Sequence, residues 1–145
     1  MVESLKAAGP LLLLATAFFL LAGLAKAAVD IMSHQPDNNI FIRWGGWFDN
    51  RVSWKRKYRN YDAGDLRPRF PGSLTWLVAC VDFWHFADAI YLKAYLAGGV
   101  CGGIAAYRSG GGWAYVALAA YASIVLGAIF ELTYKRVYRI NRAAG

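Results

Sequence analysis

The chain has 145 residues, 58% of them hydrophobic and only 17% charged, against averages of about 45–50% and about 25% in soluble domains. Its mean hydropathy is +0.31, and 16 Lys and Arg outnumber 9 Asp and Glu to give a net charge of +7. These values exclude a disordered tail, a small secreted disulfide domain and an ordinary soluble enzyme. They favour a single integral membrane domain over residues 1–145.

The first apolar run extends from Pro10 to Val29 and is interrupted only by Lys26. About 20 apolar residues are enough to cross the hydrocarbon core, so we predict a first transmembrane helix at about 10–29. The Ala25-Lys26-Ala27 step also fits a signal-peptidase site, which makes a cleaved signal peptide the competing interpretation. The length of the apolar run favours a retained helix, with Lys26 reaching toward the headgroups.

Residues 30–73 interleave cations with aromatic rings and are broken by Gly, Pro and Asn. Aromatic rings settle at headgroup level and Lys and Arg meet anionic lipid, so we expect this segment to lie on the membrane surface. A specific phosphate or protein-partner site is the alternative, and nucleic-acid stacking fits poorly beside membrane spans. The candidate lipid-surface or partner residues are Trp44, Trp47, Trp54, Lys55, Arg56, Lys57 and Arg59.

The middle apolar run, Leu74 to Tyr107, would form a helix about 51 Å long, too long for one crossing. It is too short for two crossings and a turn. We therefore predict one helix over about 74–107 whose second span begins near Asp88, with residues 74–87 as an extension at the interface. Ser73, preceded by Pro71-Gly72, is the expected N-cap.

The third apolar run, Trp113 to Leu132, has Trp113 and Tyr115 at one end and Tyr134-Lys135-Arg136 at the other. Aromatic and basic flanks of this kind anchor a span at both interfaces. We predict a third transmembrane helix at about 113–134, followed by a basic tail over 135–145.

Charge in the connections predicts the orientation. Residues 30–73 hold eight Lys and Arg and the tail holds four, whereas the N-terminal end has Lys6 and the glycine turn has Arg108. We therefore expect an all-α membrane protein with three transmembrane helices and a long cytoplasmic aromatic-basic loop between the first and second. The N-terminus is expected outside and the C-terminus in the cytoplasm.

Small residues repeat at helical spacing in the second and third spans, and such stripes let helices approach closely in lipid. They favour packing within the bundle, and docking against another membrane subunit is the alternative. The candidate packing residues are Gly98, Gly99, Gly102, Gly103, Ser123 and Gly127.

Ionisable residues gather at the predicted inner boundary, where they are costly and therefore candidates for function. Carboxylates and imidazoles from facing helices suit a divalent metal such as Zn, Mn or Fe. The candidate metal ligands are Asp30, His34, Asp82 and His85, with Asp88 and Glu131 as weaker members. The alternative is that the acids pair with Lys93, Arg51 or the basic loop and the histidines cap or hydrogen-bond locally, since no H-E-x-x-H motif is present. No catalytic residue is predicted.

Four short motifs, Asp30-x-x-x-His34, Ser53-Trp54-Lys55, Arg69-Phe-Pro-Gly-Ser73 and Asp82-x-x-His85, resemble those of a family of small bacterial integral membrane proteins. The resemblance covers about residues 28–90. That family has no assigned activity, so the resemblance implies a bacterial inner-membrane protein but no catalytic role.

We expect a non-catalytic accessory or structural subunit that docks in a larger inner-membrane complex and contacts anionic lipid through its loop. The alternative is an interfacial metal-binding protein or enzyme that acts on a lipid or amphiphile through the Asp and His residues. Proton or ion movement is a third interpretation. The absence of acids and histidines from the outer halves of the predicted spans argues against it.

Overall fold

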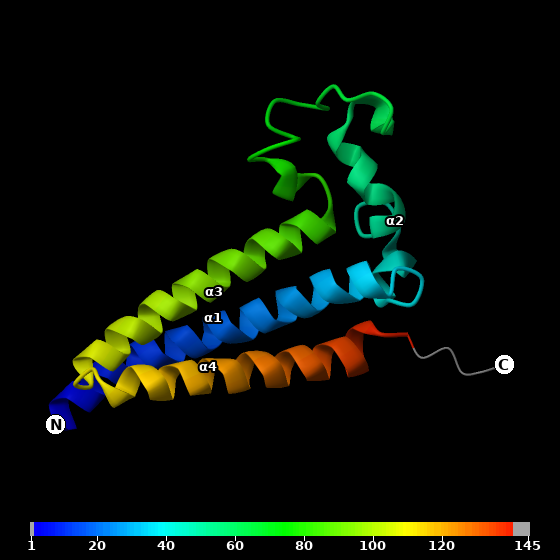
Figure 1. Cartoon of the computed structure of the whole chain (residues 1–145). Coiled ribbons are helices and arrows are strands. Elements are labelled where there is room, and N and C mark those ends of the chain that lie inside the picture. The colour runs from blue at the N-terminus through cyan, green and yellow to red at the C-terminus, as the bar shows by residue number, and fades with distance from the viewer. Residues whose placement is uncertain (1, 141–145) are drawn as a thin grey trace.

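The computed structural model describes residues 2–140, with side chains from residue 8 onward; Arg142 of the predicted tail lies outside this range. Three long helices run side by side: α1 (Val2–His34), α3 (Phe83–Arg108) and α4 (Trp113–Leu132) (Figure 1). Within the described residues the only β-type pairings are two isolated bridges. The predicted all-helical class is confirmed.

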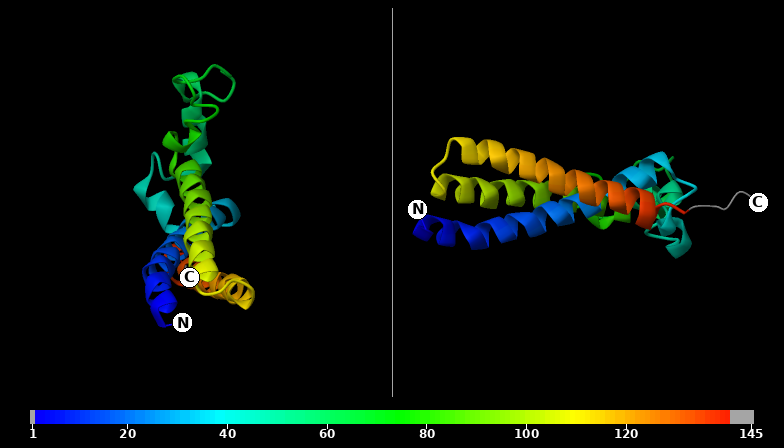
Figure 2. Two further views of the ribbon diagram at one scale, coloured as in Figure 1. Left: turned by 90° about the vertical axis from the view of Figure 1, so that its left-hand side faces the viewer. Right: turned by 90° about the horizontal axis from the view of Figure 1, so that it is seen from below.

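All three helices are long and apolar enough to cross a membrane, over Ala8–His34, Phe83–Arg108 and Trp113–Tyr138. The protein is therefore built as a multi-pass membrane protein, as its sequence predicts. α1 packs against both α3 and α4, whereas α3 and α4 make far fewer contacts with each other. Figure 2 shows the three helices aligned, with the N-terminus and the glycine turn between α3 and α4 at one end.

Glycines let the helices approach closely at three positions. A Cβ at Gly98 would lie 2.7 Å from the ring of Phe19 on α1, and one at Gly102 would lie 2.7 Å from Leu118 on α4. Gly23 of α1 faces Ile129 in the same way. Packing within the bundle thus uses part of the small-residue stripe. At the other predicted glycines, Gly99, Gly103 and Gly127, an added Cβ would have no neighbouring atom within 4 Å. Ser123 is exposed on α4.

The start of α3 differs from the prediction. The helix begins at Phe83, and residues 74–82 form turns and a short 3-10 helix, η4 (Val78–Cys80). Asp82 is the N-cap, because its side chain accepts a hydrogen bond from the backbone N–H of His85. Ser73 is instead fully buried and holds the loop together: its hydroxyl donates to the carbonyl of Lys57 and accepts from the N–H of Arg69.

The long connection between α1 and α3 is folded into short pieces rather than extended over the surface. It contains η1 (Ile40–Trp44), α2 (Asn50–Ser53), η2 (Trp54–Lys57) and η3 (Arg59–Tyr61). In Figure 1 it leaves the bundle where α1 ends and α3 begins, and it projects sideways from the helix axes. At this end of the bundle α1 ends, α3 begins and α4 ends. We call it the loop end.

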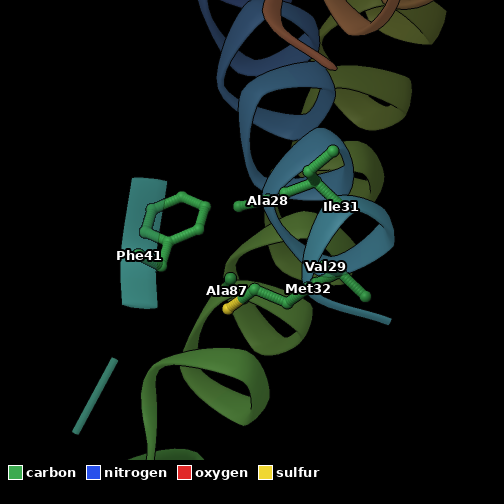
Figure 3. Close-up of a cluster of buried hydrophobic side chains, with 6 residues drawn as sticks. All are labelled: Ala28, Val29, Ile31, Met32, Phe41 and Ala87. Atoms are coloured by element: carbon green, nitrogen blue, oxygen red, sulfur yellow. The ribbon is translucent and has the colours of Figure 1, made fainter. Parts of the chain in front are cut away.

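A cluster of buried hydrophobic side chains lies at this loop end. Phe41 of η1 is 2% exposed, and its ring centroid lies 5.0 Å from that of Phe83 and 4.9 Å from that of Tyr138. The cluster of buried side chains around it joins α1, η1 and α3 (Figure 3) and consists of Ala28, Val29, Ile31, Met32, Phe41 and Ala87.

The chain that follows α4 returns to this cluster. α4 continues into a π-helical segment, η5 (Thr133–Tyr138), which brings Tyr138 against Phe41. The backbone N–H of Ile140 then donates to the carbonyl of Asn38, and Arg139 forms an antiparallel bridge with Asn39. The segments after α1 and after α4 are therefore tied to each other at the loop end.

Gly98 and Gly99 give a matched test of the helix contacts. Gly98→Leu places a side chain where Phe19 already lies, and overpacking of this kind costs about 1–3 kcal/mol. We expect Gly98→Leu to lower the thermal unfolding midpoint in detergent, followed by circular dichroism. Gly99→Leu makes the same chemical change into open space and should leave the midpoint unchanged or raised. Equal losses in both variants would contradict the arrangement of α1 and α3.

Candidate functional site

Asp82 and His85 form a fixed pair at the N-terminus of α3. One carboxylate oxygen of Asp82 accepts from the backbone N–H of His85 at 2.9 Å, and the other lies 2.8 Å from Nδ1 of the same residue. A carboxylate only accepts, so Nδ1 carries a proton and Nε2 is directed away from Asp82. The Asp82 side chain is 1% exposed and that of His85 is 22% exposed. The pair therefore holds the imidazole in a fixed orientation and leaves its Nε2 available for another contact.

Three of the other predicted metal ligands contact groups on their own helices. Asp30 lies 2.5 Å from Nζ of Lys26 on the same helix, and Glu131 lies 2.5 Å from Nζ of Lys135. Nδ1 of His34 contacts the backbone carbonyl of Asp30 at 3.0 Å. Among residues 2–140, no three His, Cys, Asp or Glu side chains, Asp88 included, are grouped to hold a metal ion. The predicted residues share one end of the bundle, but only Asp82 and His85 are brought together.

A cavity of about 350 Å³, lined by both polar and aromatic side chains, lies beside the Asp82–His85 pair. We call it the histidine cavity. Its other lining residues are Asn50, Ser53, Trp54, Lys57 and Trp84. The sequence analysis did not identify Asn50, Ser53 and Trp84 as site residues, although the Ser53-Trp54-Lys55 and Asp82-x-x-His85 motifs pointed near them.

Hydrogen bonds to α1 hold the walls of this cavity in place. The indole N–H of Trp84 donates to the hydroxyl of Ser33 at 2.8 Å. The side-chain amide of Asn50 donates to the backbone carbonyl of Met32, one of the carbonyls that the last turn of a helix leaves without a helical partner. The cavity is thus fixed to both helices at the loop end.

Four loop cations lie over aromatic rings and form what we call the cation platform: Lys55, Arg56, Lys57 and Arg69. The ammonium groups of Lys55 and Lys57 each lie 5.9 Å from the ring of Trp54. The guanidinium groups of Arg56 and Arg69 lie 5.6 and 4.8 Å from the ring of Tyr61. Cation–π contacts of this length hold a positive charge in place without neutralising it.

Two neighbouring arginines behave differently because acids neutralise them. Arg51 bonds to Asp49 at 2.7 Å and to Asp37 at 3.1 Å, and Arg67 bonds to Asp65 at 2.8 Å. The Arg67 guanidinium lowers the pKa of Asp65 to about 2. These two arginines therefore serve the fold of the loop, while the platform cations keep their charge available.

The loop backbone is shaped to hold the platform. Residues 57–59 and 67–69 run antiparallel, with the N–H of Arg59 donating to Arg67 and the N–H of Arg69 donating to Lys57. Tyr61 has a φ of +58°, which is unfavourable for a bulky residue. The fold keeps this conformation where the ring of Tyr61 meets two guanidinium groups.

The predicted surface tryptophans differ in their roles. Trp54 is part of the platform, and Trp44 is 58% exposed. Trp47 packs against Phe48, Phe83 and Phe86 with ring centroids 5.2 to 5.6 Å apart. Trp47 therefore takes part in the aromatic packing of the loop end, and its contact with lipid or a partner stays a prediction. Arg59 is exposed beside the platform.

Comparison with known proteins finds no matching family model, no matching curated protein and no matching solved structure. The resemblance to small bacterial membrane proteins stays a prediction, and the function is argued from the residues alone.

Substitutions at Asp82 test its role as the N-cap of α3. Asp82→Ala removes the acceptor for the helix N–H and should destabilise the protein by about 1–2 kcal/mol. Asp82→Asn retains an N-cap oxygen, so we expect a smaller loss in thermal or denaturant unfolding. Asp88→Ala, on the same helix, is the control and should have little effect. Equal stability of Asp82→Ala and Asp88→Ala would exclude the capping role.

Proposed function

We propose that the protein is a non-catalytic subunit of the bacterial inner membrane that rests on anionic lipid headgroups through its cation platform. The observation that carries this proposal is the pairing of Lys55, Lys57, Arg56 and Arg69 with aromatic rings. No acid in the part of the chain that the structure describes forms an ion pair with these four. Each Lys or Arg near an anionic surface contributes about 1 kcal/mol.

The position of the loop supports this proposal. The connection begins at a helix end and projects sideways from the bundle (Figure 1), so a bundle that crosses the bilayer carries the loop along the headgroup layer. Aromatic rings are well suited to that layer because one end of each is apolar and the other polar. The platform then meets lipid phosphate without leaving the interface.

Charge supports the cytoplasmic side for this end. Residues 30–73 and the tail carry twelve of the 16 Lys and Arg, and cytoplasmic connections are the ones enriched in these residues. In the proposed orientation the N-terminus and the glycine turn face outward, and the platform contacts the anionic inner leaflet.

A groove between α3 and α4 supports the role of a subunit. It has a volume of about 390 Å³, and its lining includes the small residues Gly99, Ala119 and Ala122 among larger apolar and aromatic side chains. Small residues allow close approach of another transmembrane helix, and those at Gly98 and Gly102 are already used inside the bundle. The proposed occupant is a transmembrane helix of another protein in the same membrane complex.

Headgroup contact is tested in vesicles of phosphatidylcholine with and without phosphatidylglycerol. A fluorophore on Leu66→Cys, with Cys80 and Cys101 replaced by Ser, reports quenching by lipids that carry a nitroxide near the headgroup. We expect anionic lipid to increase quenching, and Lys55→Gln with Arg69→Gln to remove most of that increase.

The matched control replaces Arg51 and Arg67 by Gln. This pair also removes two positive charges, but from arginines already neutralised by Asp49 and Asp65, so most of the increase should remain. Quenching that is independent of anionic lipid, or equally sensitive to both pairs of substitutions, would refute the proposal.

Docking is tested by native electrophoresis of membranes solubilised in a gentle detergent. The chain should migrate in a complex larger than its own 16.0 kDa, and Gly99→Leu with Gly103→Leu should release it. Ala120→Leu, at an exposed position on α4 outside the lining of the groove, should not. Migration of the wild-type chain as a monomer would exclude the docked subunit.

A further inference from the structure

The histidine cavity contains two buried polar atoms without partners. Ser53 is 2% exposed, and its hydroxyl has no hydrogen-bond partner in the described residues; the side-chain carbonyl oxygen of Asn50 has none either. Both residues line the cavity. A buried polar atom without a hydrogen-bond partner destabilises the free protein, so a ligand that satisfies both atoms gains binding energy from them.

The charges around the cavity favour an anion over a cation. Lys57 is a lining residue, and its ammonium group lies 5.9 Å from the ring of Trp54, which also lines the cavity. The one lining carboxylate, Asp82, already accepts two hydrogen bonds from His85 and has 1% of its side chain exposed. A metal ion or an amine therefore finds no free carboxylate here, while an anion meets Lys57 and the exposed edge of His85.

The unpartnered atoms specify more than an anion. The carbonyl oxygen of Asn50 only accepts, so a bare dianion cannot satisfy it, and a hydroxyl donor can. The hydroxyl of Ser53 both donates and accepts, so it suits either a phosphate oxygen or an alcohol. At about 350 Å³ the cavity is much larger than the roughly 30 Å³ that one water occupies, so it has room for a group with both parts.

We propose that the histidine cavity binds a phosphodiester whose alcohol carries free hydroxyl groups, of the glycerophosphoglycerol type. Lys57 contacts the phosphate, Asn50 accepts from a ligand hydroxyl, and Ser53 bridges the two parts. The imidazole of His85, held by Asp82, forms the wall beside the phosphate. This assignment rests on the proposed function for one point only, the supply of such groups as lipid headgroups at the loop end.

The direct test is isothermal titration of the full chain in a non-ionic detergent with glycerophosphoglycerol, which is soluble and has no acyl chains. We expect binding of one molecule per chain. Lys57→Gln should weaken it about 10-fold or more and Ser53→Ala about 10-fold, as the loss of one hydrogen bond to a charged group predicts. Inorganic phosphate and glycerol, titrated separately, should each bind at least 10-fold more weakly.

Ser53→Ala also has a readout that a merely structural role would not produce. Because the hydroxyl has no partner in the free protein, its removal should leave the thermal midpoint of the ligand-free chain unchanged or raised while it weakens binding. A lowered midpoint in the free protein would show that Ser53 supports the fold instead, and would overturn its assignment as a ligand contact.

Lys55→Gln is the matched control for Lys57→Gln. Both ammonium groups lie 5.9 Å from the ring of Trp54, but only Lys57 lines the cavity, so Lys55→Gln should leave the affinity for glycerophosphoglycerol unchanged. Absence of binding, tighter binding of inorganic phosphate, or equal effects of the two lysine variants would overturn the proposal.

A second arm distinguishes the lipid from a free phosphodiester and separates this site from the platform. Native mass spectrometry should show one phosphatidylglycerol retained by the wild-type chain and lost in Ser53→Ala. If neither the wild-type chain nor the variant retains the lipid, the cavity is assigned to the soluble phosphodiester. Titration that succeeds while the vesicle experiment fails would refute the platform and keep the cavity. The reverse pattern would refute the cavity and keep the platform.

Discussion

The burial of Phe41 is the contact on which the rest of the loop end depends. Its ring fills the space between α1, the start of α3 and the segment after α4, so three parts of the chain far apart in sequence are fixed by one side chain. The loop that follows is then anchored at both ends: Asn50 bonds to the last turn of α1, and the N–H of Phe83 donates to the carbonyl of Trp47. Neither the histidine cavity nor the cation platform could keep its geometry on a free loop.

The spans could be predicted from the sequence because hydrophobic length is a local property, whereas the start of α3 could not. Both Ser73 and Asp82 are good N-cap residues, and nothing local decides between them. In the structure the hydroxyl of Ser73 is used by Lys57 and Arg69, residues whose position depends on the path of the loop. Likewise the small residues of α3 were identifiable, but which of Gly98 and Gly99 faces α1 depends on how the helices are rotated.

In the candidate site, too, contacts within one helix could be predicted from the sequence and contacts that depend on the tertiary fold could not. Asp82 and His85 form their pair within one helical turn, so spacing alone could identify them. Asp30 and Glu131 were expected to face the same site, but each has a lysine four residues away on its own helix, and such a pair forms without any tertiary contact. Asn50 and Ser53 could not be predicted as site residues. What singles them out is that one buried polar atom of each has no hydrogen-bond partner, and this depends on how the loop folds around them. Trp47 was predicted to contact lipid or a partner because of its residue type, whereas its contacts with Phe48, Phe83 and Phe86 depend on the path of the loop and could not be predicted.

The tie between Tyr138 and Phe41 makes completion of the loop end a late event in biosynthesis. Phe41 leaves the ribosome 97 residues before Tyr138, which is about 5–20 s at ordinary rates of synthesis, and its ring is covered only when α4 has been inserted and η5 has formed. Until then the aromatic cluster remains open to the interface. A chain that stops short of η5 therefore leaves the ring of Phe41 without its contact to Tyr138 at the loop end.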